Sequence, residues 1–115
     1  MLIDLPPPAA DTSGDLSTRA LQLAALGSET RLSLFRLLVV AGENGLNTGE
    51  ISTHLNLAGS TLNHHLATLE TAGLIARERE GRHIRCRVAW VVMHGLVDYL
   101  TENCCCEFHE DPIHD

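Results

Sequence analysis

The feature that most constrains the fold is a change in apolar spacing at Gly73. Within residues 60–72 the leucines recur every three or four positions, which is the spacing of an amphipathic helix. Within residues 84–88 apolar residues alternate with arginines, which is the pattern of a half-buried strand. The glycine at position 81 marks the turn of a hairpin, so the sequence predicts a helix followed directly by a basic β-hairpin.

Helical periodicity also fills most of the chain outside this hairpin. The expected helices cover residues 15–27, 28–42, 47–55, 60–72 and 90–103, with the hairpin at 74–88. The order is therefore α-α-α-α-β-β-α. Two short helices joined by a tight turn and followed by a basic hairpin predict a mainly α winged helix-turn-helix.

Capping signals support these boundaries. Ser28 is expected to cap the second helix, and Asn47 with Glu50 fits a capping box at the start of the third. Gly73, followed by the apolar Leu74, is expected to end the fourth helix in the left-handed conformation.

The charge is distributed unevenly along the 115 residues, a length that points to one domain. The net charge of −7 argues against nucleic acid until its placement is considered. All eight basic residues are arginines between Arg19 and Arg87, and five of them fall within residues 77–87. An acidic average therefore conceals one short basic element, which is the footprint expected of a nucleic-acid-binding protein.

Composition divides the chain into three parts. Residues 1–14, rich in proline and small polar residues, are expected to form a disordered arm before the domain at 15–103. Residues 104–115 form a Cys-rich acidic tail. No apolar run approaches the roughly 20 residues of a membrane span, and the start lacks the layout of a signal peptide. We therefore expect a cytoplasmic protein with reduced thiols and no membrane partner.

Three stretches together resemble the ArsR/SmtB family of metal-responsive repressors. They are LGSETRLSLFRLL, ISTHLNLAGSTLNHHLATLETAGLI and REREGRHIRCRV, and the match extends over roughly residues 16–106. The resemblance implies a homodimer that binds operator DNA and loses affinity when an inducer binds. Many members carry Ser-Gln-Ser where this chain has Ala58-Gly59-Ser60, so its operator sequence is expected to differ.

The start of the fourth helix supplies the residues expected to read bases in the major groove. They are Ser60, Thr61, Asn63 and His64. An isolated polar helix face is usually just solvated, but the neighbouring basic hairpin favours DNA contact. His65 lies beside the leucine stripe and is expected to be a packed structural histidine.

The hairpin supplies the residues expected to contact phosphates or the minor groove. They are Arg77, Arg82, His83 and Arg85, with Arg82 favoured at the tip. The competing interpretation for alternating Arg and Glu is a solvated strand face. For Arg77 and Arg85 that alternative stays open.

Family sensors differ in where the inducer binds. The helix at 47–55 has no cysteine, so a site there is absent. A zinc site between the last helices would use His94 and Asp98, but His109 and Glu110 lie beyond the helix. Zinc is accordingly the weaker expectation.

The cysteines Cys104, Cys105 and Cys106 resemble the vicinal cysteines of members that bind trivalent arsenic or antimony. Soft thiolates select soft metals and metalloids, and methylarsenite needs only two sulfurs. Successive helical side chains turn by about 100°, so three converging sulfurs require the backbone to leave the helix near Asn103. Whether Cys106 or Cys86 supplies a third sulfur stays open, although the apolar neighbours of Cys86 favour a core role.

The sequence thus predicts an arsenic(III)-responsive repressor that dimerises through its first and last helices, whose apolar stripes need partners. Alternatives of the same fold are a zinc, cadmium or lead sensor and a thiol-redox sensor. A Cys/His metal-buffering protein is the alternative of another class. An enzyme is disfavoured, because neither a nucleophile–base arrangement nor a phosphate-binding loop is evident.

Overall fold

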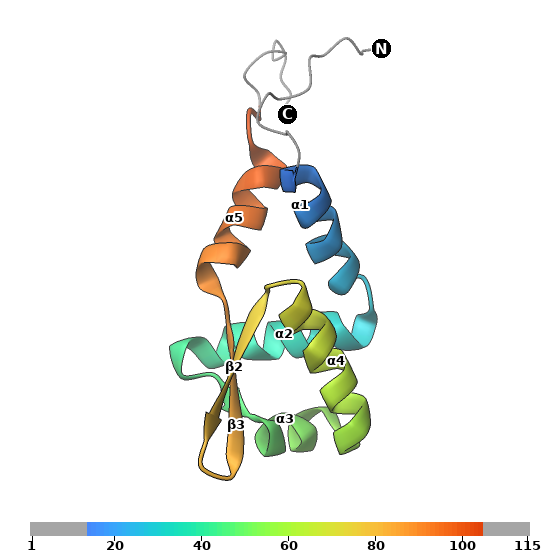
Figure 1. Ribbon diagram of the computed structural model, residues 1–115, viewed down its shortest axis with the longest axis vertical. Helices are drawn as coiled ribbons and strands as arrows, with labels where there is room; N and C mark the ends of the chain where they lie inside the picture. The colour runs from blue at the N-terminus through green and yellow to red at the C-terminus, as the bar shows by residue number, and fades with distance from the viewer. Residues whose placement is uncertain (1–13, 105–115) are drawn as a thin grey trace.

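The computed structural model describes residues 14–104 and confirms the winged helix-turn-helix (Figure 1). Within this range the chain forms α1 (Gly14–Ala25), α2 (Glu29–Ala41), the 3₁₀ turn η1 (Gly42–Asn44), β1 (Leu46–Asn47), α3 (Thr48–Leu55), α4 (Gly59–Thr71), β2 (Ile75–Glu80), β3 (His83–Val88) and α5 (Trp90–Thr101). The predicted order is confirmed, with η1 and β1 as additions. The expected arm and most of the expected tail lie outside the described residues.

The predicted helix boundaries follow from the capping residues. The Ser28 side chain accepts a hydrogen bond from the Arg31 backbone N–H at 3.3 Å, which caps α2. Asn47 and Glu50 form both hydrogen bonds of the capping box, at 2.8 and 2.9 Å. Gly73 has a φ of 79°, which ends α4 in the left-handed conformation as expected.

The sheet has three strands rather than the two that the sequence predicted. Its order is β1-β3-β2, and β1 pairs antiparallel with β3 through Leu46 opposite Cys86. A two-residue strand is too short to show an alternating pattern. Gly45, which precedes it, has a φ of 62°, and a Cβ there would collide with the Cys86 carbonyl oxygen. The missing side chain therefore lets β1 approach the hairpin.

The core lies between α2, α3, α4 and the inner face of the sheet. As predicted, the leucine stripe of α4 and alternate residues of β3 point into it. In α2, helical spacing predicts a buried stripe of Leu32, Phe35, Leu38 and Val39. Phe35 and Leu38 are buried as predicted, whereas Leu32 is exposed and Leu34 is fully buried instead. The largest fully buried side chains are Leu34, Leu38, Ile51, Leu62, Leu66, Leu69, Leu74 and Cys86.

The helices α1 and α5 lie side by side at one end of the molecule, away from the sheet (Figure 1). The Arg19 guanidinium of α1 packs over the Tyr99 ring, 5.7 Å from its centroid. A Cβ at Gly95 would lie 3.0 Å from this guanidinium, so the glycine makes room for it. Among the described residues, no helix has the length and apolar character needed to cross a bilayer.

Much of the apolar surface of this helical pair is exposed. In α1, Leu16 is 58% exposed, whereas the buried residues are Gln22 and Ala25. In α5, Leu96 is buried but Leu100 is 56% exposed. The remaining exposed apolar side chains of the pair are Leu21, Leu23, Val91 and Val97. One chain alone therefore leaves this end uncovered.

Candidate nucleic-acid interface

The outer face of α4 carries all four residues predicted to read bases. Ser60, Thr61, Asn63 and His64 are exposed in its first two turns, while the leucines of the same helix are buried. This placement follows from helical spacing, because residues at three and four positions apart share a face. The four side chains therefore form one exposed polar surface on α4.

The turn before α4 sets the angle of this surface. Asn56 has a φ of 56°, so the chain reverses within three residues between α3 and α4. The Ser52 hydroxyl donates to the Leu57 carbonyl at 2.7 Å and fixes the turn. At the start of α4, Ala58 forms no side-chain cap, as its missing hydroxyl predicted.

His65 occupies a different environment from its neighbour His64. It is half-buried, and its Nδ1 lies 3.3 Å from an Arg31 guanidinium nitrogen. Burial, then the Arg31 charge and His64, lower the pKa of His65 below its ordinary value of 6.5. These contacts support the packed structural role predicted for His65.

The arginines of the hairpin fall into two groups. Arg77 donates to Glu70 at 2.7 Å and Arg85 donates to Glu80 at 2.8 Å. These two arginines, which the sequence predicts to contact DNA, are therefore each bound to a carboxylate. Arg85 also donates to the Asn44 carbonyl at 2.8 Å. Exposed ion pairs contribute little stability, so phosphates can replace these carboxylates at small cost.

The second group consists of arginines at or near the hairpin tip that form no ion pair within the described residues. Arg82 and His83 are exposed at the turn, and within residues 14–104 Arg82 makes no ion pair. Arg79, which the sequence interpretation did not single out, is also exposed and has no ion pair in the described part. The signal that could have identified Arg79 is its position close to Gly81, the turn of the hairpin.

The two described cysteines differ sharply. Cys86 is fully buried in β3, and burial raises the pKa of its thiol to about 11. Cys104 is exposed just beyond α5, at the opposite end of that helix from the sheet (Figure 1). A helix of this length spans about 18 Å, so in this conformation Cys86 does not meet Cys104.

The backbone leaves the helical conformation where the sequence required it. After α5 ends at Thr101, Asn103 has a φ of 63°. Cys105 and Cys106 lie outside the described residues, so the predicted three-sulfur site is described only at Cys104. Asn is among the residues that most readily adopt this left-handed conformation.

The residues proposed for a zinc site form no cluster in the described part. His94 and Asp98 are both exposed on α5, one turn apart. Among residues 14–104, no three His, Cys, Asp or Glu side chains lie close enough to hold a metal ion. His109 and Glu110 lie outside the described residues.

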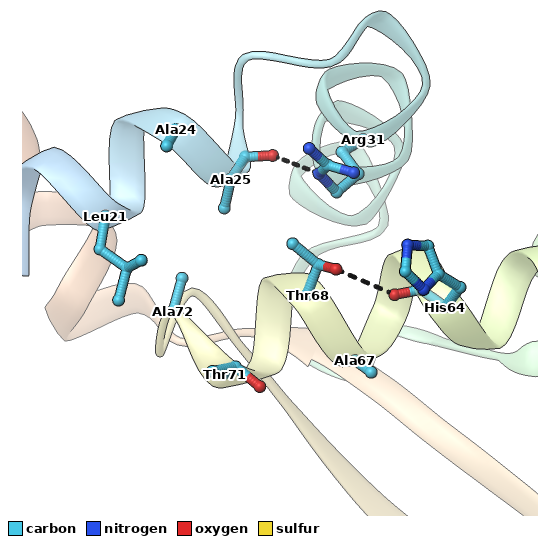
Figure 2. A pocket seen from close by; sticks show the side chains of 9 residues that line it. All are labelled: Leu21, Ala24, Ala25, Arg31, His64, Ala67, Thr68, Thr71 and Ala72. Carbon is cyan, nitrogen blue, oxygen red and sulfur yellow. Dashed lines mark hydrogen bonds between the residues drawn. The ribbon is translucent and has the colours of Figure 1, made fainter.

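A groove of about 450 Å³ runs between α1 and α4 (Figure 2). Most of its walls are apolar or small side chains, with the Arg31 guanidinium and the His64 ring among them. The lining residues are Leu21, Ala24, Ala25, Arg31, His64, Ala67, Thr68, Thr71 and Ala72. The groove therefore separates the first helix from the helix that carries the polar surface predicted to read bases.

Comparison with protein families and curated proteins gives independent evidence of kinship. A helix-turn-helix domain family matches residues 26–78. A Halobacterium salinarum protein that bears the name of an arsenical resistance operon repressor, ArsR, is 40% identical over 60 residues. That alignment covers 52% of this chain and 46% of the relative, so it spans about half of that protein.

Two further similarities cover more of the molecule. The uncharacterized HTH-type transcriptional regulator YceK of Bacillus subtilis is 37% identical over 68 residues, covering 59% of this chain and 67% of YceK. The structure of an ArsR-like transcriptional regulator from Rhodococcus sp. RHA1 matches with a TM-score of 0.67 and 26% identity, covering 76% of this chain and 80% of that one. With the winged-helix geometry, these matches show that the chain belongs to the ArsR/SmtB family of DNA-binding transcriptional regulators.

Proposed function

We propose that the protein is a homodimeric repressor that leaves its operator when trivalent arsenic or antimony binds the thiols after α5. The observation that carries the DNA-binding part is the shared exposure of two sets of residues. The polar residues at the start of α4 and the arginines without ion pairs near the hairpin tip are all exposed, and both elements lie at the end of the molecule opposite α1 and α5 (Figure 1). The proposal extends beyond the family to a direction of regulation and an inducer.

In this proposal α4 enters the major groove with its N-terminal turns against the base edges. Asn63 is suited to adenine, which its amide can contact with two hydrogen bonds, and Ser60 suits several bases. Arg82 contacts the adjacent phosphates or the minor groove. Arg77 and Arg85 join it by exchanging their carboxylate partners for phosphates.

The exposed apolar faces of α1 and α5 support dimerisation. A second copy related by two-fold symmetry would cover Leu16, Val97 and Leu100, which are each more than half exposed in one chain. It would also set the two α4 helices about one DNA turn, roughly 34 Å, apart on a near-palindromic site. A dimer additionally doubles the number of wing arginines that meet the duplex.

Val97→Asp tests this interface. The side chain is 52% exposed in one chain, so a carboxylate there should leave the monomer fold intact. Burying that charge between two copies is costly, and light scattering should show monomers where the wild type is a dimer. His54→Asp, at an exposed site on α3, is the matched control and should stay dimeric. A dimeric Val97→Asp protein would exclude this face as the interface.

The chemistry of the thiols supports the inducer. Trivalent arsenic and antimony are soft and prefer thiolate sulfur. Cys104 is exposed at the end of α5, immediately after the backbone leaves the helix, and Cys105 and Cys106 follow it in sequence. Ligation there would act on the helix that we assign to the dimer interface. One curated relative bears the name of an arsenical resistance operon repressor, which agrees with this assignment.

DNA release tests the inducer directly. The probe is a duplex that the protein selects from a randomised library, titrated with arsenite, methylarsenite, antimonite, cadmium or zinc. Arsenite should weaken binding about 5- to 150-fold, the range of typical coupling energies. Cys104→Ser and Cys105→Ser should abolish that response. Cys86→Ala is the matched control, since its buried thiol should be dispensable for release.

Each part of the proposal has its own negative result. Failure to select any duplex would overturn the DNA-binding assignment. Arsenite release that survives loss of Cys104 and Cys105 would overturn the tail site. Release by zinc or cadmium alone would favour a divalent-metal sensor instead, with His94 and Asp98 as the next residues to change.

A further inference from the structure

Arg31 lies where three helices meet. Its backbone N–H completes the cap of α2 by donating to the Ser28 hydroxyl at 3.3 Å. Its guanidinium Nε donates to the Ala25 carbonyl at the end of α1 at 2.7 Å (Figure 2). A terminal guanidinium nitrogen, Nη1, reaches His65 of α4 at 3.3 Å. One side chain thus joins α1 and α4 from its place on α2.

The contact with Ala25 is favourable for two physical reasons. The last carbonyls of a helix lack partners within the helix and need donors from elsewhere. The last turn of α1 contains no basic residue, so Arg31 supplies the positive charge that stabilises this helix end. A charged donor also forms a stronger hydrogen bond than a neutral one.

The contact with His65 fixes which ring nitrogen carries the proton. A guanidinium can only donate, so Nδ1 must accept and the proton of the neutral ring must lie on Nε2. Protonation of Nδ1 would remove the acceptor and set two positive charges against each other. The contact therefore exists only with neutral His65.

The charged groups around His65 also favour its neutral form. Of the elements packed against α4, α2 presents Arg31, and α4 itself presents His64. Both of these groups, after burial, lower the pKa of His65. Among residues 14–104, no group of α1, α3 or β2 contributes to this lowering of the His65 pKa.

The contacts of Arg31 with Ala25 and His65, which we call the Arg31 bridge, connect α1 and α4 beside the groove. Between α1 and α4 its walls are small side chains such as Ala24 and Ala67, and they enclose open space rather than a packed seam (Figure 2). Close packing therefore does not fix the spacing of the two helices along the groove. Arg31 spans from one helix to the other beside it.

We propose that Arg31 is a positioning residue that holds the DNA-reading helix α4 in register with α1, and that protonation of His65 releases it. The inference rests on the proposed DNA binding and dimerisation. Because α1 belongs to the proposed dimer interface, the bridge would make the placement of α4 follow the arrangement of the two subunits. Neither residue needs to touch DNA for this role.

Arg31→Met tests the bridge, because methionine keeps much of the apolar stem but removes every donor. Binding to the library-selected duplex should weaken about tenfold, a typical effect of losing charged hydrogen bonds. Arg31→Lys should recover part of the loss, since an ammonium group can serve one of the two acceptors. Arg36→Met, at an exposed position on α2 and equal in charge change, is the control and should stay near wild type.

A pH profile distinguishes positioning from mere stability. His65→Asn leaves an amide oxygen near the position of Nδ1, so it can accept from Arg31 yet cannot be protonated. Between pH 7.5 and 5.5 the wild type should lose roughly fivefold in affinity relative to this variant. The sign follows from the lowered pKa, since the bridged state is complete at higher pH and is lost as the pH falls. The other histidines are the same in both proteins, so their effects cancel in the ratio.

The outcomes separate the two proposals. If the wild type selects no duplex, the proposed function fails before the bridge is tested. If it binds and Arg31→Met, folded by circular dichroism, binds equally well, the positioning role is wrong. If Arg31→Met does not fold, the pH comparison decides, and identical profiles for wild type and His65→Asn would overturn the inference.

Discussion

The two ends of this molecule differ in how completely one chain buries their apolar side chains. The reading end, which comprises α2, α3, α4 and the sheet over residues 29–88, encloses eight fully buried large side chains. The helical end, which comprises α1 and α5, leaves six large apolar side chains exposed. We assign DNA reading to the end whose core is completed within one chain, and dimerisation and the response to an inducer to the end whose apolar side chains are still exposed.

The thiols repeat this contrast. Cys86 in the reading end is sealed by its neighbours, and Cys104 beyond the helical end is exposed. The same residue type therefore acts as a small apolar core residue in one place and is available for chemistry in the other. We therefore expect substitutions and thiol reagents to have very different effects at the two ends.

The largest expected difference is in the free energy of unfolding. Leu66→Ala empties space in the core of the reading end and should cost about 2–5 kcal/mol. Leu100→Ala, at a side chain 56% exposed, should cost less than about 0.5 kcal/mol at concentrations where the protein is monomeric. Urea unfolding followed by circular dichroism measures both.

Protein concentration provides the control for this pair. In a dimer Leu100 would be buried, so the cost of Leu100→Ala should increase with protein concentration. An equally large cost at every concentration would mean that the helical end is already a closed core, and the comparison would fail.

The second difference is in thiol reactivity. With the pKa of Cys86 raised to about 11, only about one part in a thousand is thiolate at pH 8, and the buried sulfur is also shielded. In a Cys105→Ser/Cys106→Ser variant, one thiol should react rapidly with iodoacetamide and the other at least about 100-fold more slowly. Peptide mass analysis should identify the fast site as Cys104.

The same pKa has a consequence for stability. The thiol ionises at lower pH in the unfolded chain than when it is buried. The stabilisation of the folded protein by the neutral Cys86 thiol is therefore complete below about pH 8.5 and is lost as the pH rises toward 11. Cys86→Ala should remove this alkaline loss. Equal alkylation rates for the two thiols would instead show that the reading end opens readily.

The third difference lies within the reading end, between the hairpin tip and its flank. Arg82→Ala should weaken DNA binding about fivefold, or ~1 kcal/mol, and lower the salt slope by about 1. Arg77→Ala should have a smaller effect, because Arg77 must first give up its hydrogen bonds to Glu70. Fluorescence anisotropy at several salt concentrations measures both slopes, and equal losses would show that the Glu70 pair does not compete with DNA.

The sequence predicted the reading end more completely than the connections within it. Periodicity placed the buried leucines of α4, and capping residues such as Asn47 set helix starts, because both are local effects. It missed β1, whose two residues are recognisable only from their pairing with β3. In α2 it placed Phe35 and Leu38 correctly but missed Leu34, because several registers of that apolar helix are equally consistent with the sequence.

The candidate site shows the same division. The exposure of Ser60 and Asn63 followed from helical spacing alone. The bridge from Arg31 to His65 joins residues 34 positions apart, and no local pattern indicates it. The carboxylate partners of Arg77 and Arg85 likewise depend on strand register and on how α4 meets β2.

The smallest expected effect concerns the start of α4, where the reading end is least complete. Ala58 is in the extended conformation of an N-cap but has no side-chain acceptor for the first amides of the helix. Ala58→Ser should therefore add about 0.5–1 kcal/mol to the free energy of unfolding, measured by urea titration. Gly59→Ser is the control, since position 59 is already within the helix and cannot cap it. The added hydroxyl should compete with phosphate for those amides, so a more stable protein is expected to bind DNA no better than the wild type. A tighter complex would instead mean that the start of α4 is disordered before DNA binds and that even the reading end is completed by its partner.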